Sequence, residues 1–497
     1  MAAKRDNSYS HVLKYTGIFG GVQGINILIV LVRNKCVALL LGPAGMGLAT
    51  LFNTTVNFIL QATNLGISFS AVRNVSELYD SGDDARISEF IRTVRGWSLL
   101  TGLLGMLLCM VVGPLLDSTT FSWGNHTWHY VALSPLVAMM AVTGGETAIL
   151  KGARRLRPLA LIQLFNVIAA LVVSVPVYFF FGASGIVPVM VLLGLVAMLV
   201  TMYYSYRLFP FRLGNRKSLV ADGIDMVRLG IAFTLAGIIG SGAEFLIRSY
   251  LNQYADLDVV GLYNAGFVMT MTYAGVVFSA LETDYFPRLS AVNSQVAKYN
   301  DLINKQAEVS LLLISPIIVS AMFLLPIVVP LLTSSAFSSV VDMMRVMTLA
   351  LFFRAVNLPI EYLSLAKGAS KSYLFLEIAY DVLMAFLVIM GYRLWGLTGT
   401  GIAILLATVL NSLLIVTYMG RRFQVRLRWG LVRIFLIQTG IGCGAFYASM
   451  LLSGAGYWAV GIVVSLLSLG VSVGILRSKT HLWRKLKARV ARRFSNR

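Results

Sequence analysis

Five basic residues lie inside stretches of sequence that are otherwise apolar: Arg33, Lys35, Arg248, Arg345 and Arg354. A cation at the centre of a membrane-spanning helix costs about 2.5–3.5 kcal/mol, so such side chains are expected to face protein or a water-filled cavity. Arginine offers planar, paired donors that match a phosphate group, and lysine adds a compact point charge. Cavity cations without matching carboxylates would therefore bind an anionic ligand.

Four acidic residues in similar surroundings are candidates for ion coupling or charge balance. Glu361 lies seven residues after Arg354, which is two turns along one helix face. Glu377 and Asp381 are four residues apart on one face of another helix, where two close carboxylates favour the binding of a proton or a sodium ion. Glu146 is the fourth acid. The alternative is that cations and acids pair with one another and only hold helices together.

The composition identifies the class of protein to which these charges belong. Of the 497 residues, 58% are hydrophobic and 12% are charged, whereas soluble globular proteins carry about 25% charged residues. The mean hydropathy of +0.79 is too high for a water-soluble fold. The glycine, proline and cysteine contents exclude fibrous, disordered and disulfide-stapled proteins. The long apolar runs lack alternation, which indicates an all-α polytopic membrane protein rather than a barrel.

Apolar runs of about 20 residues predict fourteen transmembrane helices. Their approximate bounds are 15–41, 45–72, 96–114, 131–150, 159–180, 184–206, 229–253, 260–284, 308–332, 342–366, 372–391, 397–419, 431–452 and 456–476. Most of the 41 lysines and arginines fall in alternate loops, whereas the opposite loops hold only Arg393. The positive-inside rule then places both termini in the cytoplasm. The net charge of +20 is explained by this topology and by contact with anionic lipid, rather than by nucleic-acid binding.

Two sets of residues recur at nearly the same spacing and predict an internal duplication. Arg33 with Gly47-Leu48 parallels Arg248 with Gly261-Leu262, and Glu146 with Lys151-Gly152-Ala153 parallels Glu361 with Lys367-Gly368-Ala369. Six spans per half make the two repeats parallel, with a substrate cavity expected between them. The predicted organisation is an N-terminal lobe over 1–206, a cytoplasmic linker over 207–228, a C-terminal lobe over 229–419, two further helices over 431–476 and a basic tail over 477–497.

The tail and the histidines add little chemistry. Leu482, Leu486 and Val490 recur every four residues in a tail without acidic residues, which predicts a cationic helix on the membrane surface; a solvated tail is the alternative. His126 and His129 share a predicted outer loop. Shared binding of a metal ion by these two histidines is the minor alternative, and the sequence contains no nucleotide-binding loop. We expect no enzymatic activity, metal or cofactor.

Several motifs resemble bacterial polysaccharide transporters. They are Leu41-Gly-Pro-Ala-Gly-Met-Gly-Leu48, Asn64-Leu-Gly-Ile67, Ala71-Val-Arg73, Arg248, Val260-Gly-Leu-Tyr263, Pro287-Arg-Leu289, and Ala366-Lys-Gly-Ala-Ser-Lys-Ser-Tyr373 leading to Glu377. In these motifs the chain is similar to the O-antigen and oligosaccharide flippases (Wzx type) of the multidrug/oligosaccharidyl-lipid/polysaccharide exporter superfamily. The similarity covers most of the chain and is denser in the first two spans and in spans seven to eleven.

The resemblance implies two pseudo-symmetric six-helix lobes around a V-shaped cavity, plus two helices. It implies that the protein moves undecaprenyl-pyrophosphate-linked oligosaccharide from the cytoplasmic to the periplasmic leaflet of the bacterial inner membrane by alternating access. Lys35, Arg248 and Arg354 fall where such flippases carry cavity cations, so a pyrophosphate-binding role is transferred to them, with Arg33 as a further candidate. Glu377 matches a family acid and would couple transport to protons or sodium. Expected partners are the lipid-linked glycan, membrane lipids, with anionic lipid at the tail, and polysaccharide assembly proteins.

Three other functions fit parts of the pattern. A multidrug or organic-cation antiporter of the same superfamily would need an acid-lined cavity, whereas cations dominate here. A flippase for lipid-linked peptidoglycan precursors also needs cavity cations, so only substrate complementation separates it. A structural membrane scaffold would not need charges deep in two repeats.

Overall fold

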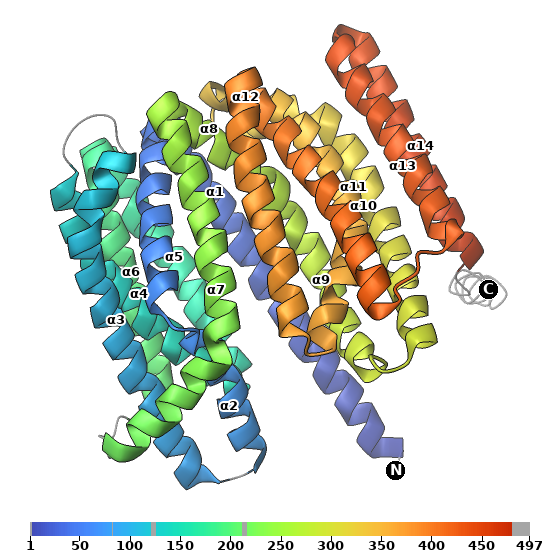
Figure 1. The fold of residues 1–497 in the computed structure, drawn as a ribbon. Helices are drawn as coiled ribbons and strands as arrows, with labels where there is room; N and C mark the ends of the chain where they lie inside the picture. Colours follow the sequence, from blue (N-terminus) through green and yellow to red (C-terminus); the bar gives the residue numbers. More distant parts are fainter. Residues whose placement is uncertain (1, 82, 121–125, 211–215, 480–497) are drawn as a thin grey trace, which may run out of the picture. The chain divides into compact units, whose positions relative to one another are not determined.

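The computed structural model describes residues 2–81, 83–120, 126–210 and 216–479, and all regular secondary structure within them is helical (Figure 1). The helices are α1 (Ala2–Thr63), α2 (Ile67–Ser81), α3 (Asp84–Thr120), α4 (Thr127–Gly152), α5 (Leu156–Phe181), α6 (Ile186–Leu208), α7 (Arg216–Tyr254), α8 (Leu257–Phe267), α9 (Tyr273–Ala291), α10 (Val296–Leu332), α11 (Val341–Ala366), α12 (Ser370–Phe423), α13 (Trp429–Leu451) and α14 (Gly454–Lys479). Short 3₁₀-helices lie at Gly182–Gly185 and Ser335–Val340, and one turn of π-helix lies at Val268–Thr272. The predicted tail helix, from Leu482 onward, lies outside the described residues.

Two of these helices are each interrupted by a break. The 62 residues of α1 and the 54 residues of α12 would extend well beyond the roughly 30 Å hydrocarbon core if they were straight. Gly42 interrupts α1 with φ 64°, and Gly396 interrupts α12 with φ 60° beside Trp395. Glycine adopts this left-handed conformation without the steric cost of a side chain. Each break falls in the gap between two predicted spans, so one long helix supplies two of them.

Length and hydropathy mark nine stretches of the described residues as able to cross a membrane. Some of these stretches contain two helical segments, such as Arg157–Leu208 and Ser370–Phe423. The prediction of an all-helical chain is confirmed, and the nine apolar stretches indicate a multi-pass membrane protein. The count of fourteen spans and the cytoplasmic placement of the termini stay predictions.

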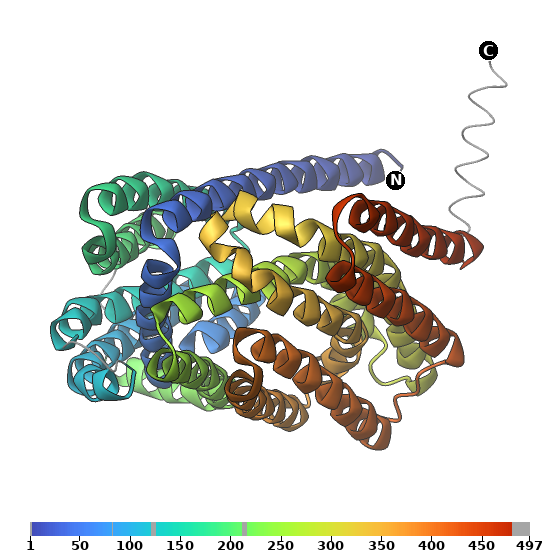
Figure 2. The same ribbon diagram turned by 90° about the horizontal axis from the view of Figure 1, so that it is seen from above.

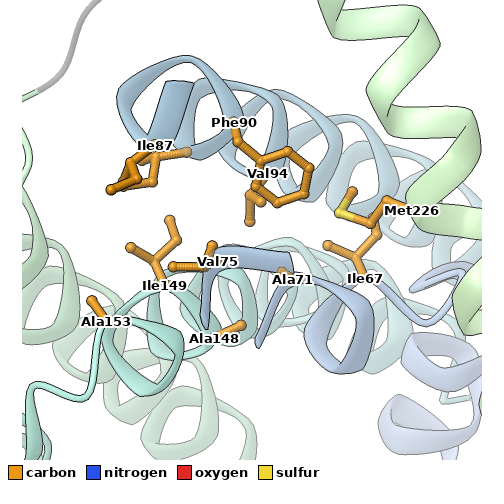
Figure 3. Packing of buried hydrophobic residues seen from close by; sticks show 11 residues of the cluster. Ile67, Ala71, Val75, Ile87, Phe90, Val94, Ala148, Ile149, Ala153 and Met226 are labelled. Atoms are coloured by element: carbon orange, nitrogen blue, oxygen red, sulfur yellow. The ribbon is translucent and has the colours of Figure 1, made fainter. Parts of the chain in front are cut away.

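The chain divides into two compact units, and the first contains residues 1–262 and 330–337. Within it, α3 packs on α4, α4 on α6, and α1 on α5 and α7. An apolar cluster joins α2, α3, α4 and α7 through side chains that include Val75, Val94, Ile149 and Met226 (Figure 3). Burying each such side chain contributes about 1.5–3 kcal/mol where water is the alternative. This cluster therefore fixes how the first unit's helices meet.

The second unit contains residues 263–329 and 338–497. Its most extensive helix pair is α11 with α12. Arg345 of α11 pairs with Asp342 at 3.0 Å and donates to the Tyr457 hydroxyl of α14 at 3.2 Å. In the α13–α14 hairpin, buried Gln438 donates to the Ser472 hydroxyl at 3.0 Å and accepts from Ser468 at 2.9 Å. Such bonds between helices replace the hydrophobic driving force that lipid does not provide.

This division differs from the predicted lobe boundary. The linker predicted over 207–228 contains the start of α7, and α7 packs on α1, α2 and α3 of the first unit rather than opening a second one. The boundary between the units falls inside α8, after Leu262. The two six-helix lobes were inferred from a repeat in the sequence, and the arrangement of the helices into these lobes stays a prediction. Figure 2 gives a second view of the helix order.

The ends of α4 and α11 support the predicted duplication. Each helix has 26 residues, and two residues after its last one the backbone is left-handed, at Arg154 with φ 55° and at Gly368 with φ 64°. In both copies the next N–H group donates five residues back, from Arg155 to Leu150 at 2.9 Å and from Ala369 to Ser364 at 2.8 Å. This is the same helix-closing turn built twice.

Candidate functional site

A polar cavity of about 170 Å³ lies inside the second unit. Its walls come from α11, from the two halves of α12 and from Met271 in the turn before α9. The polar side chains of its lining are Arg354, Asn357, Glu361, Ser364, Tyr373, Glu377, Tyr380, Thr408 and Asn411. Three charged groups from two helices thus share one small space, and we define these nine residues as the α11–α12 pocket.

Helical periodicity explains how these residues meet. Arg354 and Glu361 are seven residues apart on α11, and Tyr373, Glu377 and Tyr380 follow at intervals of four and three on the first half of α12. These spacings place side chains on one helix face. The break at Gly396 starts a second segment of α12, which supplies Thr408 and Asn411, three residues apart.

Arg354 carries a charge that no neighbouring carboxylate closely offsets. Its side chain is half-buried, and its NH1 atom lies 3.9 Å from the Met271 sulfur. Within the described parts of the chain, Arg354 takes part in no ion pair, although Glu377 is close enough to interact with it electrostatically. Asn411 donates to a carboxylate oxygen of Glu361 at 3.5 Å, a long contact. The pocket therefore combines one arginine with two glutamates, and ionisation of all three gives a net charge of −1.

The other three predicted cavity cations lie in the first unit and have partners there. Arg33 donates from Nε to the Ser174 hydroxyl of α5 at 3.1 Å, and Lys35 donates from Nζ to the Pro330 carbonyl at 2.6 Å. Both side chains are partly exposed. They point to different partners, as their two-residue spacing on a helix predicts.

Arg248, the third of these cations, has a carboxylate partner on its own helix. It is 6% exposed, and its NH1 atom lies 2.8 Å from a carboxylate oxygen of Glu244, one turn earlier on α7. The spacing of four residues predicts this pair. Its charge is therefore offset in this conformation, and an anion would have to compete with Glu244 for it.

The four acids predicted for coupling or charge balance lie in different places, and only two of them line the pocket. Glu361 and Glu377 line the α11–α12 pocket, whereas Asp381 is not among its lining residues. Glu146 lies in the first unit, where its carboxylate is 2.8 Å from Nε of Arg95. Glu146 is thus placed for charge balance with Arg95, which lies just before the predicted span 96–114 and therefore in a predicted loop.

Sequence reasoning missed the six neutral members of the pocket: Asn357, Ser364, Tyr373, Tyr380, Thr408 and Asn411. A neutral polar side chain is common in membrane helices and gives a weaker signal than a charge. One signal was available: Tyr373 and Tyr380 lie four residues before and three residues after Glu377, a spacing that places all three side chains on one helix face.

The chain is similar to known proteins in both sequence and structure. Residues 12–293 match the model of the polysaccharide biosynthesis protein family. No curated protein matches the chain. The structure resembles the lipid II flippase MurJ in an inward closed conformation, with a TM-score of 0.73, 14% identity, and 93% of this chain and 99% of that chain covered.

Two further solved structures are similar. One is an inward-facing multidrug resistance MATE family transporter of the MOP superfamily, with a TM-score of 0.67 and 17% identity over 80% of this chain and 94% of that one. The other is a MOP superfamily transporter from Pyrococcus furiosus with a binding pocket of reversed polarity, with a TM-score of 0.56 and 16% identity over 82% and 93%. These likenesses show the fold of MOP-superfamily transporters. Because the family model covers more than half of its residues, the chain belongs to the polysaccharide biosynthesis protein family.

Proposed function

We propose that this protein is a flippase that moves undecaprenyl-pyrophosphate-linked oligosaccharide from the cytoplasmic to the periplasmic leaflet of the bacterial inner membrane by alternating access. The lipid-linked head is too polar for hydrocarbon to solvate, so the protein must replace its water with side-chain donors. Arg354 is the central pyrophosphate ligand, and Arg33, Lys35 and Arg248 are further ligands. Lys35 and Arg248 exchange their present partners for the anion.

The observation that carries this proposal is the state of Arg354. A permanent cation inside an apolar helix pair is costly, and it is retained where it binds a ligand. Arg354 faces a polar cavity and forms no ion pair within the described residues. A volume of about 170 Å³ is below the 300–1,000 Å³ typical of sites that enclose a whole small molecule. The pocket therefore suits a phosphate group or a coupling ion, and the sugars bind elsewhere.

The two glutamates provide a way to couple anion binding to protons. With Glu361 and Glu377 both ionised, the pocket has a net charge of −1 and disfavours a phosphate. Protonation of one glutamate makes the pocket neutral, and protonation of both leaves the arginine's positive charge. Anion binding and proton binding then strengthen each other, as linkage requires. The expected consequence is tighter binding of the lipid-linked anion at lower pH; sodium would replace the proton in the alternative form of coupling.

A second candidate substrate is the lipid-linked peptidoglycan precursor. It is favoured by the similarity to the lipid II flippase, which extends over 99% of that chain. Both substrates present a polyprenyl diphosphate, so both require the same cationic group. A multidrug antiporter is supported by the MATE likeness and by the two glutamates of the pocket, but Arg354 would repel an organic cation there.

The test is complementation of two bacterial strains, one lacking its O-antigen flippase and one dependent on a regulated lipid II flippase. The wild-type chain is expected to restore surface glycan in the first strain and not growth in the second. Arg354→Ala is expected to abolish rescue and Arg354→Lys to retain part of it, because lysine keeps the charge but loses paired donors. Arg345→Lys is the matched control, since Arg345 is held by Asp342 and Tyr457 outside the pocket. Quantified membrane insertion must be equal for all variants.

Full rescue by inserted Arg354→Ala would remove this residue from the mechanism. Rescue of the second strain alone would assign the protein to peptidoglycan synthesis. Rescue of neither strain, together with drug-resistance transport, would support the antiporter.

A further inference from the structure

The connection between α12 and α13 is held extended by two asparagine side chains. Asn300 of α10 donates to the Gln424 carbonyl at 3.0 Å and accepts from the Arg426 N–H at 2.7 Å. Asn304 donates to the Arg426 carbonyl at 2.8 Å and accepts from the Arg428 N–H at 2.7 Å. Each amide offers both a donor and an acceptor, and residues four apart lie above one another on a helix. The two side chains therefore pair with alternate residues of the segment, as a neighbouring strand would.

This pairing fixes which side chains the segment exposes. Val425 is 8% exposed, whereas Arg426 and Arg428 on either side of it are exposed. Exposed arginines continue on the last turn of α12 and the first turns of α13. We call this set the arginine edge; it comprises Arg421, Arg422, Arg426, Arg428 and Arg433.

The arginine edge has more positive charge than its neighbours offset. Arg428 is 2.7 Å from Asp301, which also pairs with Lys305 at 2.6 Å. Within the described residues, the other four arginines form no ion pair. Arg422 does lie 6.0 Å from the centre of the Phe423 ring, a weak cation–π contact that leaves its charge available.

The position of the arginine edge along the chain indicates that it lies at the membrane–water interface. It lies where the apolar helix α12 ends and the apolar helix α13 begins, and this connection can be followed in Figure 1. Trp429, at the first position of α13, is 72% exposed, and exposed tryptophans are typical of the membrane–water interface. The distribution of basic loops predicts that this end faces the cytoplasm, where acidic lipids are enriched.

A cavity beside the edge suits the rest of a lipid. It has a volume of about 540 Å³ and joins Lys305, Glu308 and Arg428 to apolar Leu312 and Leu476. Its lining combines two cations, one acid and several apolar side chains, so it can accept both the glycerol backbone and the start of the acyl chains of a phospholipid whose phosphodiester binds the unpaired arginines of the edge.

We propose that the arginine edge is a binding site for acidic phospholipid of the inner leaflet. The phosphodiester and acidic headgroup accept hydrogen bonds from Arg421, Arg422, Arg426 and Arg433, and the start of the acyl chains lies beside Leu312 and Leu476. Asn300 and Asn304 position the arginines before lipid arrives. The site is independent of the pyrophosphate pocket and of the transported substrate.

The test is native mass spectrometry of the full-length chain in an uncharged detergent, titrated with phosphatidylglycerol or phosphatidylcholine of the same acyl chains. The expected result is preferential retention of phosphatidylglycerol. Arg422→Gln with Arg426→Gln removes two charges, which is expected to weaken this binding about 30-fold. The matched control is Arg73→Gln with Arg228→Gln, which removes two exposed arginines that already face Glu77 and Asp225. The control is expected to bind phosphatidylglycerol nearly as the wild type does.

A third variant separates a shaped site from net charge. Asn300→Ala with Asn304→Ala keeps every charge but removes the four bonds to the segment, and it is expected to lose most of the preference. Equal losses in the test and control pairs would overturn the proposal, as would an unchanged preference in the asparagine variant. Displacement of phosphatidylglycerol by millimolar inorganic phosphate would also overturn it, because it would show a site for free anions rather than for lipid.

Discussion

The pair of Arg95 and Glu146 allows the clearest test of how charge stabilises this fold. Nε of Arg95 on α3 lies 2.8 Å from one carboxylate oxygen of Glu146 on α4, and NH2 lies 3.3 Å from the other. Their side chains are only 7% and 2% exposed. The Ser205 hydroxyl of α6 also donates to Glu146, and Arg95 donates to the Phe209 carbonyl at 2.9 Å. One ion pair thus joins three helices of the first unit.

We expect Glu146→Gln to destabilise the protein by about 3–5 kcal/mol, because it keeps the shape of the side chain but leaves the buried Arg95 charge without its counter-ion. The double variant Arg95→Met with Glu146→Leu is expected to recover most of this loss, since an apolar pair has no buried charge to compensate. The matched control is Arg73→Gln, which breaks a pair with Glu77 whose side chains are 58% and 62% exposed. An exposed pair of this spacing contributes only about 0.3–0.5 kcal/mol.

The assay is reversible denaturant unfolding of the full-length chain in mixed micelles, followed by tryptophan fluorescence. The informative comparison is between variants measured under the same conditions, because absolute stabilities depend on the micelle. If Glu146→Gln loses no more free energy than Arg73→Gln, then burial does not make this pair important and the reasoning is wrong. If the double variant is as unstable as the single one, the loss arises from hydrogen bonds to α6 rather than from uncompensated charge.

Three further predictions use the same unfolding measurement or a direct probe of one element. Gly396→Ala is expected to cost about 1–2 kcal/mol, because an L-residue is strained at the left-handed break in α12; an unchanged unfolding midpoint would contradict this. Gln438→Leu removes the partner of Ser468 and Ser472 and should loosen the α13–α14 hairpin by about 1 kcal/mol, seen as faster proteolysis there. Burial lowers the pKa of His126, despite an opposing effect of Asp117. Stability is therefore expected to be level above about pH 6.5 and to fall below it by at most about 1.4 kcal/mol per pH unit. His126→Gln should remove that decline, and a decline unchanged by the variant would assign it to other groups.

The elements of this fold were largely predictable because lipid-spanning helices have a strong one-dimensional signal. All but two of the predicted spans lie entirely in described helical segments: 45–72 crosses the turn at 64–66 between α1 and α2, and 431–452 extends one residue beyond α13. The breaks in α1 and α12 fall in the gaps left at 42–44 and 392–396. Hydropathy locates such segments without any tertiary information. The grouping into compact units was not predictable in this way. Whether α7 packs on the helices before it or after it depends on its side-chain contacts, and the apolar pattern of α7 is the same in either case.

The candidate site was predictable where charges lie close in sequence. Arg354 with Glu361, and Arg248 with Glu244, follow from the spacing of residues on one helix. By contrast, Arg95 and Glu146 are 51 residues apart and meet only because α3 packs on α4. The predicted span 96–114 leaves Arg95 in a loop, so the sequence did not indicate this buried pair. Asn411 and Thr408 were missed for another reason. The second half of α12 packs beside the first half and so brings them to the pocket, and no local sequence pattern indicates this packing.

The two copies of one acid show how a duplicated fold can keep its frame and diverge in chemistry. Glu146 and Glu361 lie 215 residues apart on α4 and α11, which have equal length and the same closing turn. In the first copy Arg95 offsets the acid and excludes solvent from it. The position 215 residues after Arg95 is Ser310, which has no charge, and Glu361 instead faces Asn411 in the pocket that holds Arg354. Glu146, the acid of the first copy, therefore stabilises the packing of its helices. The second copy keeps an acid in a polar pocket, where a proton, a cation or an anion beside Arg354 can change its charge balance, and for this reason we propose that ion coupling and the central contact with the anion lie in the second unit.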